Sequence, residues 1–476
     1  MQHPADFKDK QVVVLGLARS GVSVAKLFHK YGALVVVNDK KEREQSPEAA
    51  ELEALGIPVI CGYHPDDLIT ENTSLLIKNP GIPYSAPPIQ KAIELHINII
   101  TEVEVAYWLS QAPIIGITGS NGKTTTTTIV GKLLEAAQLN PIVGGNIGLP
   151  LCEIAEQVSE ENWIVAELSS FQLKGTISFK PQIGVLLNLA ETHLDYHGGM
   201  EDYVNSKAKL FANHTEQDVV VYNADDKVVK SIGEQAKGRK FPFSIYQLLE
   251  QGVFVSPSYE ATSEDDASVT RYIMYKKNPQ EEAVKLMPVS ELGIPGRHNV
   301  ANAIAAIATA IMAGADISKL VVPLQAFRGV EHRLEYVKTI DGITYYNDSK
   351  ATNGVATTMT IRSLQAPIVL IAGGLDRGSD YMELLPLFKD KVKAIVTIGE
   401  TRHKIAHIAT LAGLAHVEVV EPSSSTESTL HEAVVRASQL ATAGDIVLLS
   451  PACASWDMFE TFEQRGSMFK QSVHIL

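Results

Sequence analysis

The stretch GSNGKTTTTTIVGK, residues 119–132, follows the apolar run PIIGIT and precedes a segment with the pattern of a helix. An apolar strand, a glycine-containing turn and a helix in this order form a phosphate-binding unit, because backbone amides at a helix start point at an anion. We expect Lys123 to pair with the outer phosphates of a nucleotide and Thr124 to ligate magnesium. The strict motif has glycine where this chain has Ile117, so a turn that only joins strand to helix is the alternative.

Strand and helix patterns on both sides of this loop predict three successive α/β units. The first begins with a buried-strand pattern at 11–16, a helix over about 20–31 and a strand at 33–39, which is typical of a Rossmann-like start with parallel strands. Apolar runs continue the second unit at 113–119, 163–169, 183–189 and 218–226, and the third at 343–349, 367–374, 393–399, 417–421 and 445–452. A polar, acidic stretch within 246–278 indicates a small antiparallel appendage.

We therefore predict an α/β protein of three successive domains, since 476 residues are too many for one hydrophobic core. The predicted domains are a Rossmann-like N-terminal domain at 1–101, a central P-loop mononucleotide-binding domain at 102–329, and a Rossmann-like C-terminal domain at 330–476.

The composition limits the class of protein. A formal net charge of −14 opposes nucleic-acid binding, which usually needs a basic face. No apolar run reaches the roughly 18 residues of a membrane span, and the first residues lack the order of a signal peptide, so we expect a cytoplasmic protein. Three widely separated cysteines argue against disulfides and zinc sites. A monomer is expected.

Polar residues follow several of the predicted strands, at the edge where open α/β sheets collect ligands. They are Glu167, then His193 and Asp195, then Asp348 and Lys350. A carboxylate and an imidazole near the threonine of the loop could complete a magnesium shell. For His193, a hydrogen-bonded structural histidine is the alternative.

Several motifs together resemble those of the Mur ligases of peptidoglycan synthesis, and they span all three predicted units. They are GSNGKT, ELSSFQL, NLAETHLDYH followed by SKAKLF, GRHNVANAIAA, FRGVEHRLE, YYNDSKATN and LLSPACASWDMFE. The resemblance implies that ATP phosphorylates the carboxylate of UDP-N-acetylmuramoyl-L-alanine. The amine of D-glutamate then attacks the acyl phosphate, and a tetrahedral intermediate releases phosphate.

The resemblance also implies a set of ATP and metal residues. Those for ATP are Gly119, Ser120, Asn121, Gly122, Lys123, Thr124, Thr125, Asn299, Asn302, Arg333 and Asp348. Two magnesium ions are expected, with Thr124, Glu167, His193 and a carbamylated Lys207 as ligands. Because one residue is missing between His193 and Tyr203 relative to the family pattern, Lys209 is the alternative for the carbamylated lysine. His332 and Lys350 complete the implied catalytic set with Lys123, His193 and Lys207.

For the substrates, the resemblance implies contacts in the first and last units. The UDP-sugar contacts are Arg19, Ser20, Asp39, Lys40 and Gly81, with Asn146 for the muramoyl part. A purely structural turn is the alternative for the first unit. The D-glutamate contacts are Ser455, the backbone of Trp456, Phe462 and Arg377. The family carries lysine where this chain offers Arg377, and arginine suits bidentate carboxylate binding.

Other functions explain fewer of these residues. An NAD-dependent dehydrogenase would leave the loop at 119–125 unexplained, and Ala18 breaks the dinucleotide fingerprint of the first unit. A sibling Mur ligase adding another amino acid, or a folate-directed relative, would share the central loop. A non-catalytic nucleotide-binding module would give no reason for His332, Asp348 and Lys350.

Overall fold

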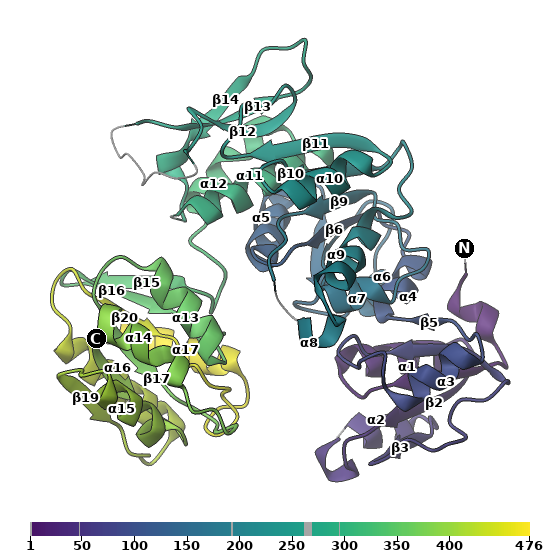
Figure 1. The fold of residues 1–476 in the computed structure, drawn as a ribbon, viewed down its shortest axis with the longest axis horizontal. Coiled ribbons are helices and arrows are strands. Elements are labelled where there is room, and N and C mark those ends of the chain that lie inside the picture. The colour runs from purple at the N-terminus through teal and green to yellow at the C-terminus, as the bar shows by residue number, and fades with distance from the viewer. Residues whose placement is uncertain (1, 47, 192–193, 261–268, 295) are drawn as a thin grey trace. The chain divides into compact units, whose positions relative to one another are not determined.

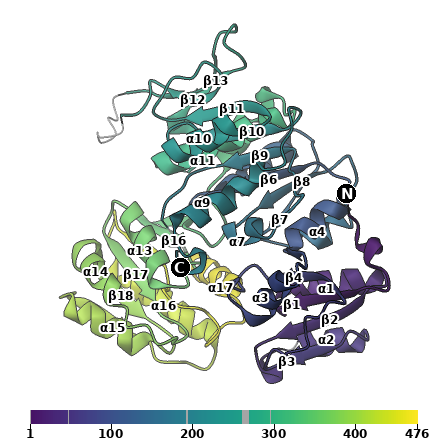
Figure 2. The same cartoon turned by 45° about the vertical axis from the view of Figure 1, so that its right-hand side comes forward.

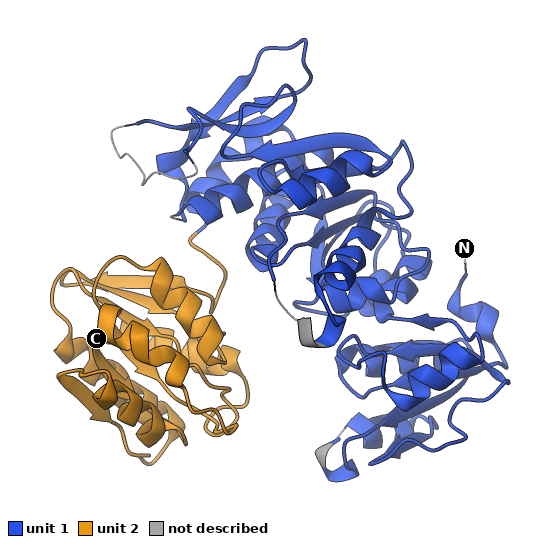
Figure 3. Ribbon diagram, in the orientation of Figure 1, with its two compact units in different colours: residues 1–327 blue, residues 328–476 orange. Residues whose placement is uncertain are grey.

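The computed structural model describes the chain except residues 1, 47, 192–193, 261–268 and 295. It divides into two compact units, residues 1–327 and residues 328–476 (Figure 3). In the described residues the strands form three sheets built mainly of parallel strands, two in the first unit and one in the second. The predicted α/β class with three domains is therefore confirmed, whereas the domain boundaries stay predictions.

The N-terminal sheet has the strand order β3-β2-β1-β4-β5, and all its pairs are parallel. Residues of β1 alternate between two apolar clusters, with Val12 and Val14 in one and Val13 and Leu15 in the other, so both faces of the sheet are covered. The strands are β1 Gln11–Leu15, β2 Leu34–Asp39, β3 Val59–Cys61, β4 Thr73–Lys78 and β5 Ile99–Ile100. The helices are α1 Arg19–Lys30, α2 Glu48–Ala54, α3 Pro87–Glu94 and α4 Glu102–Leu109.

The central sheet has the order β14-β13-β12-β11-β10-β9-β6-β8-β7. The predicted appendage is an extension of this sheet: β12 pairs in parallel with β11, and β13 and β14 then add antiparallel strands (Figure 1). The strands are β6 Ile114–Thr118, β7 Pro141–Gly145, β8 Trp163–Glu167, β9 Ile183–Leu186, β10 Val219–Asn223, β11 Arg239–Ser244, β12 Gly252–Ser256, β13 Tyr272–Lys276 and β14 Val284–Pro288.

Helices α5 and α11 pack on each other and on strands of the central sheet. Figure 2 labels α11 beside β10, one of the strands that it contacts. Threonine is a poor helix former, but Thr124, Thr126 and Thr127 of α5 are buried, so packing stabilises this helix. The helices of this region are α5 Lys123–Ala136, α6 Leu151–Ala155, α7 Ser170–Lys174, α8 Leu194–His197, α9 Met200–Ala208, α10 Lys227–Gln235, α11 Arg297–Met312 and α12 Val321–Ala326. No helix in the described ranges is long and apolar enough to cross a membrane.

The second unit holds the sheet β15-β16-β20-β17-β18-β19, in which only the edge pair β15 and β16 is antiparallel among the described strands. Ile368 and Leu370 belong to one apolar cluster and Val369 and Ile371 to another, so helices cover both faces. The strands are β15 Glu335–Ile340, β16 Ile343–Asn347, β17 Ile368–Ala372, β18 Val392–Thr397, β19 His416–Val419 and β20 Ile446–Leu449. The helices are α13 Gly354–Ser363, α14 Leu385–Lys391, α15 Arg402–Leu411, α16 Thr426–Leu440 and α17 Phe462–His474.

Candidate active site

The phosphate loop joins β6 to α5 and needs its glycines. Gly122 has φ 80°, in the left-handed region, and a Cβ atom there would overlap Oδ1 of Asn302 on α11. A Cβ on Gly119 would lie 2.9 Å from Cβ of Leu187. The structure thus brings Asn302 against the loop, and Nδ2 of Asn302 lies 3.4 Å from Oδ1 of Asn299 one turn away.

Residues that follow β9 hold the loop in place. The amide of Ser120 donates to the carbonyl of Asn188 (2.9 Å), the amide of Asn121 donates to Oδ1 of Asn188 (2.8 Å), and Nδ2 of Asn188 donates back to the carbonyl of Asn121 (3.0 Å). The hydroxyls of Ser120 and Tyr203 lie 2.7 Å apart. Since the amides of Ser120 and Asn121 are engaged within the protein, the amides at the start of α5 are the ones that remain for phosphate.

Two lysines converge on the same loop. Nζ of Lys123 donates to the carbonyls of Gly119 and Ser120, both at 2.8 Å. Nζ of Lys207, on α9, donates to the carbonyl of Gly119 at 2.9 Å and to Oγ1 of Thr118 at 3.2 Å. Burial of Lys207, which is 1% exposed, lowers its pKa to about 6, helped by the nearby charge of Lys123. The lowered pKa favours the uncharged amine over the ammonium.

The alternative lysine points elsewhere. Nζ of Lys209 donates to the carbonyls of Lys174 and Thr176, at 2.7 and 2.8 Å. Of the two candidates, the structure brings Lys207 to the phosphate loop.

Glu167 ends β8 and is 2% exposed. Its Oε1 accepts a hydrogen bond from Nδ2 of Asn146 (2.9 Å), and its Oε2 is buried without a hydrogen-bond partner in the described structure. A buried carboxylate oxygen without a partner is costly, so it fits a cation that would occupy this place. Thr124, also buried, supplies a second oxygen of the kind that magnesium prefers. His193 lies outside the described residues.

In the N-terminal sheet, Asp39 shapes the turn after β1. Its Oδ2 accepts from the amide of Leu17 (2.7 Å) and its Oδ1 from the amide of Lys41 (2.9 Å). The hydroxyl of Ser20 donates to Oδ1 of Asn79 at 3.0 Å. Arg19 and Lys40 are exposed at the same edge, and the position of Gly81 has open space around it. The sequence did not indicate Asn79, although it directly follows β4 as ligand residues do.

A second buried lysine lies beside this edge. Lys78 is 1% exposed, and its Nζ donates to the carbonyl of Pro80 (3.0 Å) and to the hydroxyl of Tyr196 (3.1 Å). That hydroxyl donates in turn to the carbonyls of Pro80 and Ile82, at 2.9 and 3.2 Å. Burial lowers the pKa of Lys78 to about 7.

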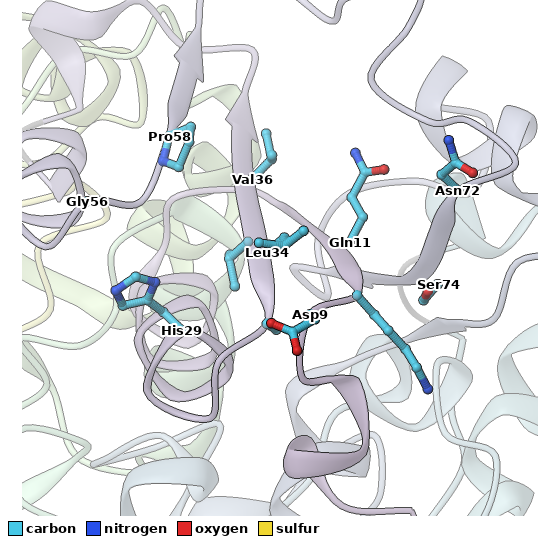
Figure 4. Close-up of a pocket in the computed structure, with 12 residues that line it drawn as sticks. Asp9, Gln11, His29, Leu34, Val36, Gly56, Pro58, Asn72 and Ser74 are labelled. Atoms are coloured by element: carbon cyan, nitrogen blue, oxygen red, sulfur yellow. The ribbon is translucent and has the colours of Figure 1, made fainter.

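The pocket in Figure 4 lies away from these residues. It has a volume of about 710 Å³ and is lined by Gln11, Leu34 and Ser74, at the amino ends of β1, β2 and β4. Asp39 and Asn79 lie at the carboxyl ends of the same sheet, so none of the predicted site residues lines this pocket.

In the second unit, the predicted residues after β16 gather around one another. The buried carboxylate of Asp348 accepts from the hydroxyls of Thr360 (2.6 Å) and Ser450 (2.8 Å), and burial raises its pKa to about 6. Nζ of Lys350 lies 5.4 Å from the ring centroid of Phe462, and its amide donates to the carbonyl of His332 at 3.0 Å. Arg333 follows His332 in the chain, and its positive charge acts to lower the pKa of Asp348, against the larger effect of burial.

Arg465 is a residue that the sequence did not indicate. It is fully buried on α17, and its Nε donates to Oγ of Ser349 at 3.0 Å. Its Nη2 donates to the carbonyls of Ser349 (2.8 Å) and Cys453 (3.1 Å). Arg465 thus ties the segment of Asp348 and Lys350 to the segment of Ser455, which is itself buried.

The sequence is similar along its whole length to known proteins. It matches the descriptions "Mur ligase MurD-like, N-terminal domain" over residues 10–101, "Mur ligase middle domain" over 117–310 and "Mur ligase, glutamate ligase domain" over 332–453. It is 45% identical over 477 residues to the UDP-N-acetylmuramoylalanine–D-glutamate ligase of Geobacillus sp. (strain WCH70) and 47% identical over 476 residues to that of Bacillus cereus (strain B4264), covering 100% of each chain in both cases.

Among solved structures, the fold is similar to UDP-N-acetylmuramate-alanine ligase MurC from Thermotoga maritima. The TM-score is 0.53 at 21% identity, covering 98% of this chain and 99% of that one. The three consecutive domain matches and the full-length relatives agree with the motifs of the phosphate loop and of the second unit, and on these grounds the chain belongs to the Mur ligase family.

Proposed function

We propose that this protein adds D-glutamate to UDP-N-acetylmuramoyl-L-alanine with hydrolysis of ATP, a cytoplasmic step of peptidoglycan precursor synthesis. Full-length relatives that are 45–47% identical carry this activity in their names. The structural observation that carries the proposal is the arrangement of Lys123 and Lys207 on one carbonyl of a phosphate loop. The charge of Glu167 acts on Lys207, and Oε2 of Glu167 is buried without a hydrogen-bond partner in the described structure.

The chemistry explains why a carboxylate substrate needs this loop. A negatively charged carboxylate resists attack by an amine, and oxide is a poor leaving group. Transfer of the γ-phosphoryl group of ATP to the carboxylate removes both obstacles, because phosphate then leaves when the amine attacks. Lys123 and the amides of α5 would stabilise the charge of the transferring phosphoryl group.

Magnesium would neutralise charge on the phosphates when it is bound. Thr124 and Glu167 would hold it, together with His193 and a carbamylated Lys207. The carbamate forms when an unprotonated amine attacks carbon dioxide and releases a proton, which gives an anionic group in place of a cation. Two observations support this: the lowered pKa of Lys207, and the absence of an ion pair to its Nζ among the described residues. An anion at this position would suit a metal better than an ammonium.

For the UDP-sugar, we propose that Arg19, Ser20, Lys40, Gly81 and Asn146 contact the substrate. Both carboxylate oxygens of Asp39 already accept backbone hydrogen bonds, so its contribution includes holding the turn that would receive the diphosphate. The amides at the start of α1 supply an anion site of the same kind as those of α5.

For D-glutamate, we propose Ser455, the backbone of Trp456, Phe462 and Arg377 as contacts. His332, Arg333, Asp348 and Lys350 would act on ATP and the transferring phosphoryl group. The grouping of Lys350 with Phe462, and the ties of Arg465 to both segments, support a joint role for these residues in the second unit. We expect the protein to act as a monomer.

The test is ADP release by the purified protein with ATP, magnesium and UDP-N-acetylmuramoyl-L-alanine. D-glutamate is compared with L-glutamate, D-alanine and L-lysine, and the product is identified by mass. Release confined to D-glutamate is expected. Release with another amino acid would assign a sibling reaction. Release with none, while ATP still binds, would leave a nucleotide-binding module without ligase activity.

A further inference from the structure

Two loops of the second unit meet at the carboxyl ends of neighbouring strands. The loop with Arg377 follows β17 and the loop with Trp456 follows β20, and these strands pair in parallel. The amide of Leu375 donates to the carbonyl of Ala454 at 3.0 Å, which ties the loops together. Ligands of open α/β sheets bind at this edge, so both loops face the region where a substrate would arrive.

The side chains of Arg377 and Trp456, one from each loop, lie against each other. The guanidinium carbon of Arg377 lies 4.8 Å from the ring centroid of Trp456. Trp456 is 65% exposed, so burial of its apolar surface does not explain why a tryptophan occupies this position. A guanidinium over an aromatic face can keep N–H groups in its plane available for a carboxylate.

The carboxylate nearest in sequence does not compete for Arg377. Oδ1 of Asp376 accepts from the amide of Gly378 (2.9 Å), and Oδ2 of Asp376 pairs with Nζ of Lys404 (2.5 Å). Within the described ranges no carboxylate forms an ion pair with Arg377. The amide of Asp376 also donates to Oε2 of Glu400 at 3.0 Å, which fixes the backbone before Arg377.

We propose that the indole ring of Trp456 is a positioning group that holds the guanidinium of Arg377 ready to bind the side-chain carboxylate of the incoming amino acid. This inference rests on the proposed function and adds a role for the Trp456 side chain. By positioning Arg377, Trp456 would favour an amino acid that carries a second carboxylate. A lysine at 377 could neither stack in this way nor present two parallel donors.

The experiment measures KM for D-glutamate in the full-length protein at saturating ATP and UDP-N-acetylmuramoyl-L-alanine. Trp456→Ala is expected to raise this KM about threefold to thirtyfold, and Trp456→Phe to raise it less, because phenylalanine keeps an aromatic face. KM for ATP and the melting temperature should stay unchanged. Leu411→Ala is the matched control, since it removes an exposed apolar side chain at the end of α15 in the same unit.

A double-mutant cycle separates positioning from a general effect. If Trp456 acts through Arg377, then Trp456→Ala adds little in an Arg377→Ala background, and each variant lowers the preference for D-glutamate over D-glutamine. If the two substitutions raise KM independently, or if Trp456→Ala leaves KM for D-glutamate unchanged, this inference is wrong while the proposed function still stands. A wild-type protein without D-glutamate-dependent ADP release would overturn the proposed function, and this inference with it.

Discussion

Two buried lysines of the first unit, Lys78 and Lys207, differ in what surrounds them. Each is 1% exposed, and neither forms an ion pair in the described structure. Burial lowers the pKa of both, to about 7 for Lys78 and about 6 for Lys207. Each lies near a second lysine, Lys174 for Lys78 and Lys123 for Lys207. Of the two, Lys207 bonds to the phosphate loop and lies near the charge of Glu167, whose Oε2 is buried without a hydrogen-bond partner in the described structure. A shifted pKa therefore marks burial in both cases, and the surroundings indicate chemistry only for Lys207.

The largest expected difference is in activity. Lys207→Ala should lower kcat at least about a hundredfold, because it removes the proposed carbamate near the metal. Lys78→Met should leave kcat nearly unchanged, because methionine replaces an amine that lies against a carbonyl and a tyrosine. Wild-type protein and Lys78→Met should both lose activity in buffer freed of carbon dioxide and regain it with bicarbonate. Equal losses of kcat in the two variants would contradict the comparison.

The second difference concerns magnesium. Glu167→Gln should raise the magnesium concentration needed for half-maximal ADP release by about tenfold to a hundredfold, because an amide is a weaker ligand. The free energy of unfolding should not fall much, since a buried charge with an unpartnered oxygen is removed.

Glu104→Gln is the matched control for Glu167→Gln. The buried carboxylate of Glu104 accepts from the amides of Ile177 and Phe179 and from Nε1 of Trp108. This variant should lower the free energy of unfolding and leave the magnesium requirement unchanged. A shifted magnesium requirement in Glu104→Gln would show that the readout reports stability rather than metal binding.

The third difference is in stability and concerns Lys78. Tyr196→Phe removes a hydroxyl that donates to the carbonyls of Pro80 and Ile82 and accepts from Lys78. We expect a loss of about 1–3 kcal/mol in the free energy of unfolding measured with urea, because buried polar groups lose their partner. Tyr203→Phe, near Lys207, removes a single contact to Ser120 and should cost less. The reverse order would contradict the assigned partners.

The fourth difference is in the pH dependence of stability. Between the folded pKa of Lys78, about 7, and its ordinary value of 10.5, the unfolded chain binds one more proton than the folded chain. The free energy of unfolding therefore rises with pH in this window, by up to about 1.4 kcal/mol per pH unit, and Lys78→Met should flatten that rise. Lys207 should add to this rise in the free energy of unfolding only when carbon dioxide is excluded, because a carbamate has no amine to protonate. A slope that Lys78→Met leaves unchanged would show that Lys78 is charged in the folded protein.

The sequence alone predicted those features of the site that depend on residues close together in the chain. The pattern of apolar residues predicted that Glu167 ends a strand and that the phosphate loop lies between a strand and a helix. Both features depend on residues that are neighbours in the sequence. Lys207 was indicated only by the resemblance to the family, since a lysine in a helix carries no local signal of burial. Lys78 was missed because its partner Tyr196 lies 118 residues away. Asn188 and Arg465 were missed for the same reason, since each meets the rest of its site through the tertiary fold.

The ties between the phosphate loop and Asn188 affect how nucleotide affinity would arise. Ser120 and Asn121 are held through their backbone, and Nζ of Lys123 already lies on two carbonyls of the loop. The conformational entropy lost in ordering this segment is therefore lost when the chain folds rather than when ATP arrives. If nearly every folded molecule holds the loop in this shape, the apparent dissociation constant of ATP equals the intrinsic one, without a correction for a rare competent state.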